Sequence, residues 1–340
     1  AATKNVSAKH KEGTLSQLAA PYDVYYDLGK AYQVNFQFEK AKTAYEKYLG
    51  TLLRDDKENI GLLKQLIKSC ESAKDMISKP VSFNVENLGN NFNDEKTNFN
   101  PVISTDGKTL MYMVSLKFYD AVMFSKFSNG KWSMPVNITP ELQAENGIFI
   151  SCLSSDGNTL YLSMDDNFNS DIYTSNYTID NKWSEIKPLN KNINTKYWES
   201  HGFVSEDGNT LVFASDRPGG FGGLDLYISK KENGEWGPAL NLGSKINTSF
   251  NEDRPSLINK GKTLFFSSQG HQNIGGYDIF KSDLQGNNNW SDPVNLGYPI
   301  NTPDDNLFFM PSPDGKSGYI SIYKDSEGFG KEDIYKIIFK

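Results

Sequence analysis

The chain has 340 residues, a formal net charge of -7 and an aromatic content of 13%, and this length allows two domains. The negative charge, without a basic stripe interleaved with aromatics, argues against a nucleic-acid partner, and no apolar run approaches the roughly 18–20 residues that cross a bilayer. Cys70 and Cys152 lie far apart in different kinds of segment, which predicts two free buried thiols rather than a metal site or a disulfide.

Residues 1–79 are predicted to form a small α-helical domain that is tetratricopeptide-like. The stretch 25–49, "YYDLGKAYQVNFQFEKAKTAYEKYL", spaces its aromatic and small residues as that repeat does. Gly29 and Ala41 would let two antiparallel helices approach closely, with Tyr32 and Tyr45 filling the space between them. A third helix over about residues 55–78 carries an apolar stripe.

The remainder, residues 80–340, contains five copies of one signal with a period of about 50 residues, which is typical of propeller blades. Each copy places a turn glycine between two apolar, alternating stretches, the pattern of a tight β-hairpin. The turn sequences are "STDGKTLMYM" at Ser104, "SSDGNTLYLS" at Ser154, "SEDGNTLVFAS" at Ser205, "INKGKTLFFSS" at Ile258 and "SPDGKSGYIS" at Ser312.

Each copy continues into a third predicted strand, such as "DLYIS" or "DIFKS", and then into a fourth that follows a tryptophan, as in "WGPALNLG". Four strands per copy predict a mainly β fold, a five-bladed β-propeller with four-stranded blades. The last copy stops after its third strand, whereas residues 81–88 align with a fourth strand and have no blade of their own. We therefore expect strand 81–88 to complete the last blade and close the ring.

Two recurring polar positions are interpreted as structural. The third strands begin with an aspartate in four copies, and Ala121 replaces it in the first. Fourteen residues before each turn glycine lies an amide residue, for which we expect backbone capping within the loop. These amides are Asn93, Gln143, Asn194, Asn247 and Asn301. For the neighbouring Asp216 and Arg217 we expect a local ion pair.

The glycine-rich stretch 219–229, "GGFGGLDLYIS", resembles a phosphate-binding loop only superficially. A phosphate loop leads into a helix whose N–H groups face the phosphate, and here a strand follows. No cofactor is predicted.

Strand order places the short turns on one face of the propeller and the long, varied connections on the other. Binding residues concentrate on loops that a rigid scaffold supports, so partner-binding residues are expected on the long-loop face. The candidates are Tyr197, Trp198, Glu199, His201, Arg217, Phe221, Phe250, Glu252, Arg254 and His271.

No metal site is expected, since the histidines lack ligand spacing. One segment, "DDNFNSD", offers oxygen ligands at alternate positions, as at the start of a calcium loop. The positions are Asp165, Asn167, Asn169 and Asp171. Ser170 stands where such a loop needs glycine, so a turn rich in Asn and Asp is the preferred interpretation.

The pattern "SxDGxTLxFxS…GGxDIYxS…NGxWSxPVNLGxxINT" resembles the WD40-like (PD40, TolB-type) propeller repeat over about residues 81–340. With a tetratricopeptide-like segment before it, the chain resembles the N-terminal half of the PorE-type envelope proteins of Bacteroidota, in which an OmpA-like domain follows the propeller and which are linked to type IX secretion. This resemblance implies a periplasmic, outer-membrane-associated location without a membrane span, and envelope proteins as partners. It assigns peptidoglycan binding to no residue of this sequence.

From these observations we expect a non-catalytic scaffold or adaptor for protein–protein interactions, and no enzymatic activity. The alternative is a glycan-binding or glycan-cleaving propeller with aromatic residues and acids such as Glu199 or Glu252 near the axis. Cleavage would require a deep axial pocket with two carboxylates about 5–10 Å apart. A third hypothesis is the binding of an extended peptide in the axial channel, as in TolB.

Overall fold

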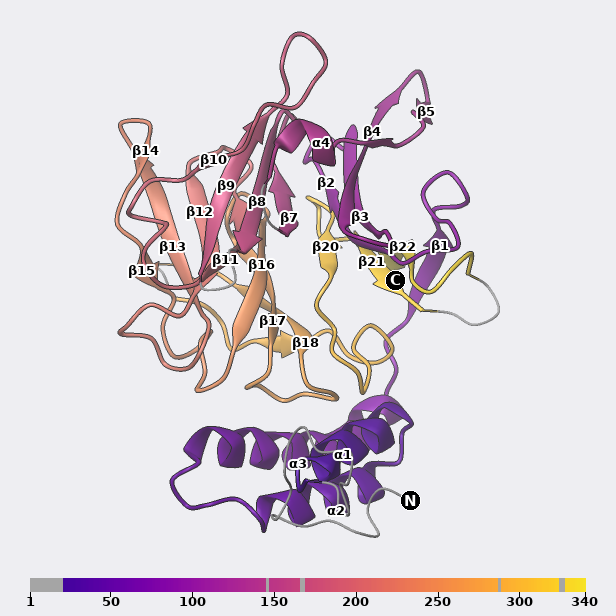
Figure 1. Ribbon diagram of the computed structural model, residues 1–340, viewed down its shortest axis with the longest axis vertical. Helices are drawn as coiled ribbons and strands as arrows, with labels where there is room; N and C mark the ends of the chain where they lie inside the picture. The colour runs from indigo at the N-terminus through magenta and orange to yellow at the C-terminus, as the bar shows by residue number, and fades with distance from the viewer. Residues whose placement is uncertain (1–20, 145–146, 166–168, 287–288, 324–327) are drawn as a thin grey trace. The chain divides into compact units, whose positions relative to one another are not determined.

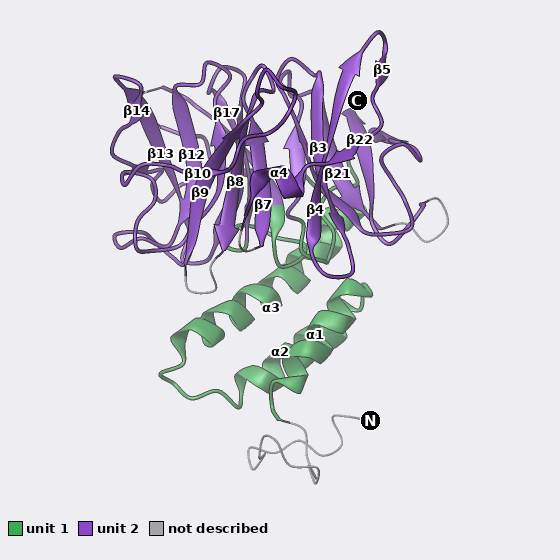
Figure 2. Cartoon of the chain, turned by 45° about the horizontal axis from the view of Figure 1, so that its top comes forward, with its two compact units in different colours: residues 1–81, 269–278, 295–306 green, residues 82–268, 279–294, 307–340 purple. Residues whose placement is uncertain are grey.

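The computed structural model describes residues 21–144, 147–165, 169–286, 289–323 and 328–340. The chain divides into two compact units (Figure 2). Unit 1 comprises residues 1–81, 269–278 and 295–306, and unit 2 comprises 82–268, 279–294 and 307–340. Residues 1–20 of the predicted helical domain lie outside the described residues. No helix in the described part of the chain is both long and apolar enough to cross a membrane.

Unit 1 contains the helices α1 (Val24–Val34), α2 (Phe38–Leu49) and α3 (Lys57–Ser78). Gly29 of α1 lies against the ring of Tyr45 in α2, and a Cβ atom at Gly29 would lie 2.3 Å from Tyr45 Cε1. The expected role of a small residue in this close approach is therefore confirmed. Helix α3 begins after Asp56, whose carboxylate accepts the backbone N–H of Asn59 at 3.3 Å.

The core of unit 1 joins the helices to the two distant segments of the same unit. Tyr45, Leu63, Leu66 and Cys70 are buried together with Ile274. Three helix side chains also donate to backbone carbonyls of segment 269–278: Gln33 to Ile274 at 3.3 Å, Gln65 to His271 at 2.8 Å and Ser72 to Asn273 at 2.8 Å. Unit 1 is thus assembled from segments about 200 residues apart in sequence.

The strands form five sheets, one for each predicted blade, so the mainly β, five-bladed propeller is confirmed (Figure 1). The first contains β2 (Asn98–Ile103), β3 (Thr109–Ser115), β4 (Asp120–Ser128), β5 (Lys131–Trp132) and β6 (Val136–Asn137), with the short helix α4 (Thr139–Leu142) after it. The second contains β7 (Ile148–Leu153), β8 (Thr159–Asp165), β9 (Ser170–Asn176) and β10 (Lys187–Pro188). The third contains β11 (Glu199–Val204), β12 (Thr210–Ser215), β13 (Asp225–Glu232), β14 (Glu235–Trp236) and β15 (Leu240–Asn241).

The fourth sheet contains β16 (Glu252–Ile258), β17 (Thr263–Ser268), β18 (Asp278–Asp283) and β19 (Val294–Asn295). The fifth contains β20 (Phe309–Pro311), β21 (Ser317–Ile322), β22 (Asp333–Phe339) and β1 (Phe83–Asn87). The outer strands β6, β10, β15 and β19 pair over only two residues, shorter than the stretch of about eight expected from the sequence. A proline stands in or at most two residues before each of these short strands, and its missing N–H limits the ladder.

Strand β1 pairs antiparallel with β22, with Val85 opposite Ile337. The ring is therefore closed by the strand that the sequence analysis predicted. Asn93, in the loop after β1, strengthens the closure, because its side chain donates to Ile334 O at 3.0 Å and accepts from Ile334 N at 2.8 Å.

The hydrophobic core of unit 2 lies between neighbouring blades, as expected for a propeller. One cluster joins Met111 and Met113 of the first blade to Ile150 and Leu162 of the second. Similar clusters join the second blade to the third, the third to the fourth, and the fifth to the first.

The aspartate that begins a third strand has the structural role expected for it. Asp225 accepts from Phe221 N at 2.7 Å, from Gly222 N at 3.1 Å and from Asn241 Nδ2 at 2.7 Å. It thereby fixes the glycine-rich loop to the outer strand. At Gly222 a Cβ atom would lie 2.1 Å from Phe250 O, so the glycines permit close backbone approach between loops.

The recurring amides also bind backbone, chiefly that of the third strand. Asn247 accepts from Leu226 N at 2.7 Å and donates to Leu226 O at 3.0 Å, and Asn194 makes the same pair of bonds with Ile172. Asn194 also donates to Leu189 O at 3.4 Å, five residues before it. The expectation of capping within the loop is therefore incomplete, because Asn93, Asn194 and Asn247 also connect the loop to the third strand.

Candidate functional site: an axial pocket

The innermost strand of four blades carries a register shift, in β2, β7, β11 and β16. Three bulge residues have positive φ: Asn100 at 51°, His201 at 30° and Arg254 at 51°. A β-bulge redirects one side chain, and non-glycine residues with positive φ are strained and cluster at functional sites. These residues, with Ile150 and Phe308, occupy the position seven residues before each turn glycine.

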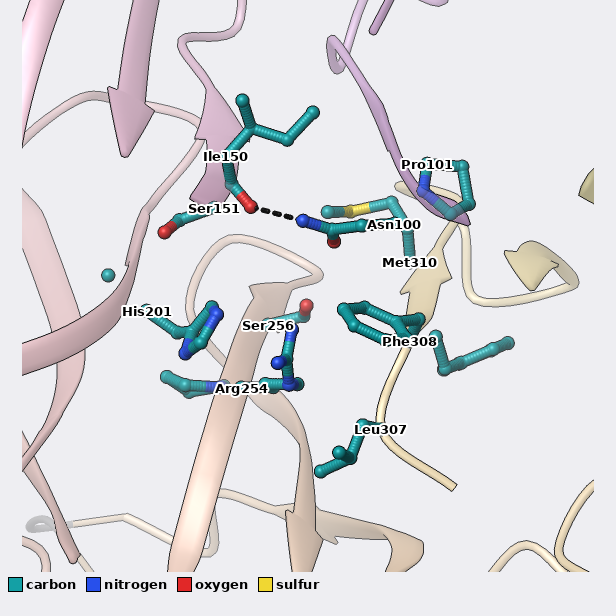
Figure 3. Close-up of a pocket in the computed structure, with 13 residues that line it drawn as sticks. Asn100, Pro101, Ile150, Ser151, His201, Arg254, Ser256, Leu307, Phe308 and Met310 are labelled. Carbon is teal, nitrogen blue, oxygen red and sulfur yellow. Dashed lines mark hydrogen bonds between the residues drawn. The ribbon is translucent and has the colours of Figure 1, made fainter. Parts of the chain in front are cut away.

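The redirected side chains line one pocket on the propeller axis (Figure 3). Ser151 from the second blade, Ser256 from the fourth and Met310 from the fifth complete its polar and apolar walls. Its volume is about 20 Å³, room for one or two water-sized groups. A second cavity of about 20 Å³ lies at the turn-side ends of the inner strands, and Met310 lines both.

Arg254 brings a permanent positive charge to the pocket. Its guanidinium carbon lies 3.9 Å from the centroid of the Phe308 ring, a distance typical of a cation–π contact. On another wall, Asn100 Nδ2 donates to Ile150 O at 2.7 Å.

His201 is oriented by a buried carboxylate. Asp253 Oδ1 accepts from Ser200 Oγ at 3.0 Å and from Arg254 N at 2.8 Å, and lies 3.2 Å from His201 Nδ1. Burial raises the pKa of Asp253, but the charge and hydrogen bond of His201, with the charge of Arg254, outweigh it and set the pKa to about 2. Burial and then the charge of Arg254 lower the pKa of His201, against the opposing effect of Asp253. His201 is therefore neutral at pH 7, with its proton on Nδ1 towards Asp253.

Two polar atoms in this wall have no hydrogen-bond partner among the described residues: Ser151 Oγ and His201 Nε2. Both are buried and belong to residues that line the pocket. Because Nδ1 carries the proton, Nε2 is an acceptor, and the serine hydroxyl both donates and accepts. The pocket thus offers an unused acceptor, an unused hydroxyl and a cation.

Of the candidate residues predicted from the sequence, only His201 and Arg254 line the pocket. Glu199 and Glu252 are fully buried. Glu199 accepts from Thr195, Ser215 and Arg217, and Glu252 from Thr248 and Ser268. Their predicted place near the axial opening is corrected: both hold the loop before their own strand.

The sequence predicted an ion pair between Arg217 and Asp216, and this prediction is corrected. The Arg217 guanidinium pairs instead with Glu199 Oε1 at 3.1 Å. Its guanidinium also lies about 5 Å from the rings of Phe213 and Tyr227. Asp216 instead accepts the backbone N–H of Trp198 at 2.8 Å.

The remaining candidates are dispersed. Tyr197, Trp198 and Phe250 are half-buried, and Phe221 is exposed. His271 belongs to unit 1, so the ten candidates do not form one surface of unit 2. As binding residues they remain predictions.

The calcium hypothesis receives no ligand set from the described residues. Asn167 lies outside them. Asn169 donates to Thr195 O at 3.4 Å, and Asp165 and Asp171 lie in β8 and β9. No group of three or more His, Cys, Asp or Glu side chains in the described ranges is arranged to hold a metal ion.

Eleven of the 13 lining residues were not identified from the sequence, among them Asn100, Ser151 and Phe308. The signal for Asn100 and Phe308 was present, because counting seven residues back from each turn glycine gives the inward position in every blade. Ser151 has no such signal, since it follows that position.

No family model and no curated protein matches the chain. Among solved structures, TolB from Acinetobacter baumannii is similar, at 16% identity and a TM-score of 0.44, over 72% of this chain and 55% of that one. A thermostable family-43 glycoside hydrolase has 12% identity and a TM-score of 0.47, over 73% and 91% of the two chains. An alpha-L-arabinofuranosidase from Podospora anserina, solved with cellotriose, has 12% identity and a TM-score of 0.44, over 77% and 97%.

The chain therefore spans about half the length of the TolB chain that it resembles. At these identities the likeness concerns the fold alone. The prediction of a non-catalytic scaffold without enzymatic activity is corrected to this extent: glycoside hydrolases are among the solved structures that are similar to this fold, so the fold itself is no ground for excluding catalysis. The carboxylate pair expected for cleavage is not in the pocket, whose 13 lining residues, all described, include no Asp or Glu.

Proposed function

We propose that this protein is a glycan-binding propeller whose axial pocket receives one functional group of a sugar residue. The observation that carries the proposal is the pair of unpartnered atoms, Ser151 Oγ and His201 Nε2, in the wall of that pocket. A buried polar atom without a partner costs about 1–3 kcal/mol. A ligand that supplies the missing partners recovers this free energy.

Sugar hydroxyls match these atoms, because a hydroxyl donates to an acceptor such as His201 Nε2 and exchanges hydrogen bonds with Ser151 Oγ. Phe308 adds an aromatic surface on the opposite side of the pocket (Figure 3). The volume of about 20 Å³ admits a substituent but not a whole ring, so the rest of the sugar would remain at the mouth of the pocket.

The proposal is tested by ligand-observed NMR titration of the full chain with a panel of neutral and acidic mono- and oligosaccharides. Ser151→Ala, which removes the hydroxyl, and His201→Phe, which removes the acceptor, are expected to weaken binding about tenfold each. Ser128→Ala, which changes an exposed serine of β4, is expected to leave affinity unchanged. Absence of binding by every saccharide, or binding unaffected by the two pocket variants, would contradict the proposal.

Two further proposals rest on the sequence resemblance alone. The repeat pattern supports a periplasmic location, and the spacing in residues 25–49 supports a tetratricopeptide-like character for the helices. Fractionation of the cells that produce the protein tests the first: recovery in the cytoplasmic fraction would contradict it.

A further inference from the structure

The electrostatics of the axial pocket restrict the kind of group that it accepts. Arg254 is a lining residue and no lining residue is acidic. The carboxylate of Asp253 accepts from Ser200 and from the backbone N–H of Arg254 and lies beside His201 Nδ1, and the charge of Arg254 also acts on it and lowers its pKa. A permanent positive charge thus belongs to a small cavity whose 13 lining residues include no Asp or Glu.

The size of the cavity restricts the group further. About 20 Å³ accommodates a group of one or two water-sized atoms, and a carboxylate has two oxygens. A guanidinium binds a carboxylate through parallel N–H donors, and Ser151 Oγ can donate to the same group.

Resting on the glycan-binding function proposed above, we propose that the group entering the pocket is a carboxylate, that the ligand is an acidic saccharide of the uronic-acid class, and that protonation of His201 strengthens its binding.

The proton dependence follows from the position of His201. The charged groups around it are Asp253 and Arg254, both from β16, and the Phe149 ring of β7 lies 6.4 Å from its ring. In the neutral form, Nε2 presents a lone pair that repels a carboxylate. In the protonated form, Nε2 becomes a donor and adds a second positive charge beside Arg254.

These charges determine whether affinity rises or falls with pH. A bound carboxylate favours the imidazolium, so it raises the pKa of His201, which burial and Arg254 lower in the free protein. Between the free and the bound pKa, affinity increases up to tenfold for each unit of decreasing pH. A uronic acid remains ionised above about pH 4, near the ordinary pKa of a carboxyl group.

The experiment compares glucuronate with glucose, which differ at C6 alone, by NMR titration of the full chain at pH 5.5 and 7.5. Glucuronate is expected to bind at least tenfold more tightly than glucose at pH 5.5, with a smaller ratio at pH 7.5. Arg254→Gln is expected to abolish this preference while glucose binding persists. Arg54→Gln, which changes an exposed arginine, is the matched control.

His201→Gln keeps an acceptor but cannot titrate, so its glucuronate affinity is expected to be independent of pH. Arg254→Lys keeps the charge and is expected to retain part of the preference, and thermal unfolding checks that each variant is folded.

Equal affinity for the two sugars would overturn the inference and leave the proposed function standing. If N-acetylglycine binds as tightly as glucuronate, the pocket recognises a peptide-type carboxylate and the saccharide class is wrong. If neither glucose nor glucuronate binds, the inference fails, and the proposed function fails with it only when every other saccharide of the panel also shows no binding.

Discussion

Glu199 and Glu252 begin the inner strands of neighbouring blades and make the same bonds to a threonine four residues earlier. They differ in charge environment, because Glu199 has the Arg217 guanidinium at 3.1 Å. For Glu252, burial raises the pKa to about 7, against the hydrogen bonds of Ser268 and Thr248. The same residue type at one repeat position therefore has two electrostatic roles.

Replacing Arg217 tests how much the Arg217–Glu199 ion pair contributes to the free energy of unfolding. Arg217→Met leaves the fully buried Glu199 without its cation, and breaking a buried pair costs about 3–5 kcal/mol. Because Arg217 is slightly exposed, we expect a loss of about 3 kcal/mol in the free energy of unfolding, measured with urea. Arg217→Lys keeps the charge and should lose less; equal losses would show that stacking on Phe213 and Tyr227, not charge, matters.

The pKa of Glu252 predicts how stability depends on pH. Because the folded-state pKa lies above the ordinary value of 4.5, the folded protein holds this proton more tightly than the unfolded chain. The contribution is complete below about pH 4.5 and is lost as pH rises through about 7. Asp278, whose pKa burial also raises to about 7, acts in the same direction.

We therefore expect the free energy of unfolding to fall by about 2–4 kcal/mol between pH 5.5 and 8.5, since each of the two carboxyls contributes up to about 2 kcal/mol over the 1.5 pH units below its pKa of about 7. Glu252→Gln should reduce this fall, whatever its effect on absolute stability, since its amide does not titrate. Urea midpoints at both pH values provide the measurement. A wild-type stability that rises over this interval would be incompatible with the buried, proton-binding carboxyl.

At the scale of the element, the propeller depends on β1, a strand of five residues at the outer edge of the last blade. Leu88 N donates to Ile334 O and Lys340 N to Ser82 O, so the bonded pairs of this ladder fall on even-numbered residues of β1. The odd-numbered residues direct their N–H groups away from β22.

This alternation makes a matched pair of proline variants. Glu86→Pro removes an N–H that faces β22, whereas Val85→Pro removes one that faces outward from the edge strand. A net hydrogen bond contributes about 1 kcal/mol, so Glu86→Pro should destabilise by at least about 1 kcal/mol more than Val85→Pro in urea unfolding. The reverse order would mean that β1 pairs in a different register.

At the scale of the whole molecule, each compact unit combines segments that are remote in sequence. Ile274, from the loop between β17 and β18, is fully buried in the cluster that contains Tyr45, Leu66 and Cys70 of the helices. The stability of unit 1 therefore depends on a residue about 200 positions from its helices.

Truncating Ile274 tests whether the helices of unit 1 depend on this contact with segment 269–278. Ile274→Ala should lower the free energy of unfolding, followed by circular dichroism at a helical wavelength, by about 2–4 kcal/mol. The control, Ile179→Ala, changes a side chain that is 97% exposed and should stay within about 0.5 kcal/mol. Equal effects of the two substitutions would indicate that the helices do not need this contact.

The sequence by itself determined the repeat, the number of blades and the closing strand, because turn glycines and alternating apolar residues encode local geometry and recur at a fixed spacing. It also identified the recurring aspartate as structural, since its position repeats. It placed His201 and Arg254 only within a broader set of ten residues.

Only the tertiary structure decided which of these side chains meet. Whether a polar side chain points towards the axis depends on the bulge of its strand. Glu199 and Glu252 each lie two residues before a bulge residue, and they accept instead from a threonine of the preceding loop and from a serine of the neighbouring strand. The partners of Arg217 and Ile274 are likewise set by contacts between distant segments. Local sequence carries no record of such contacts, because they form only when the blades and the loops pack.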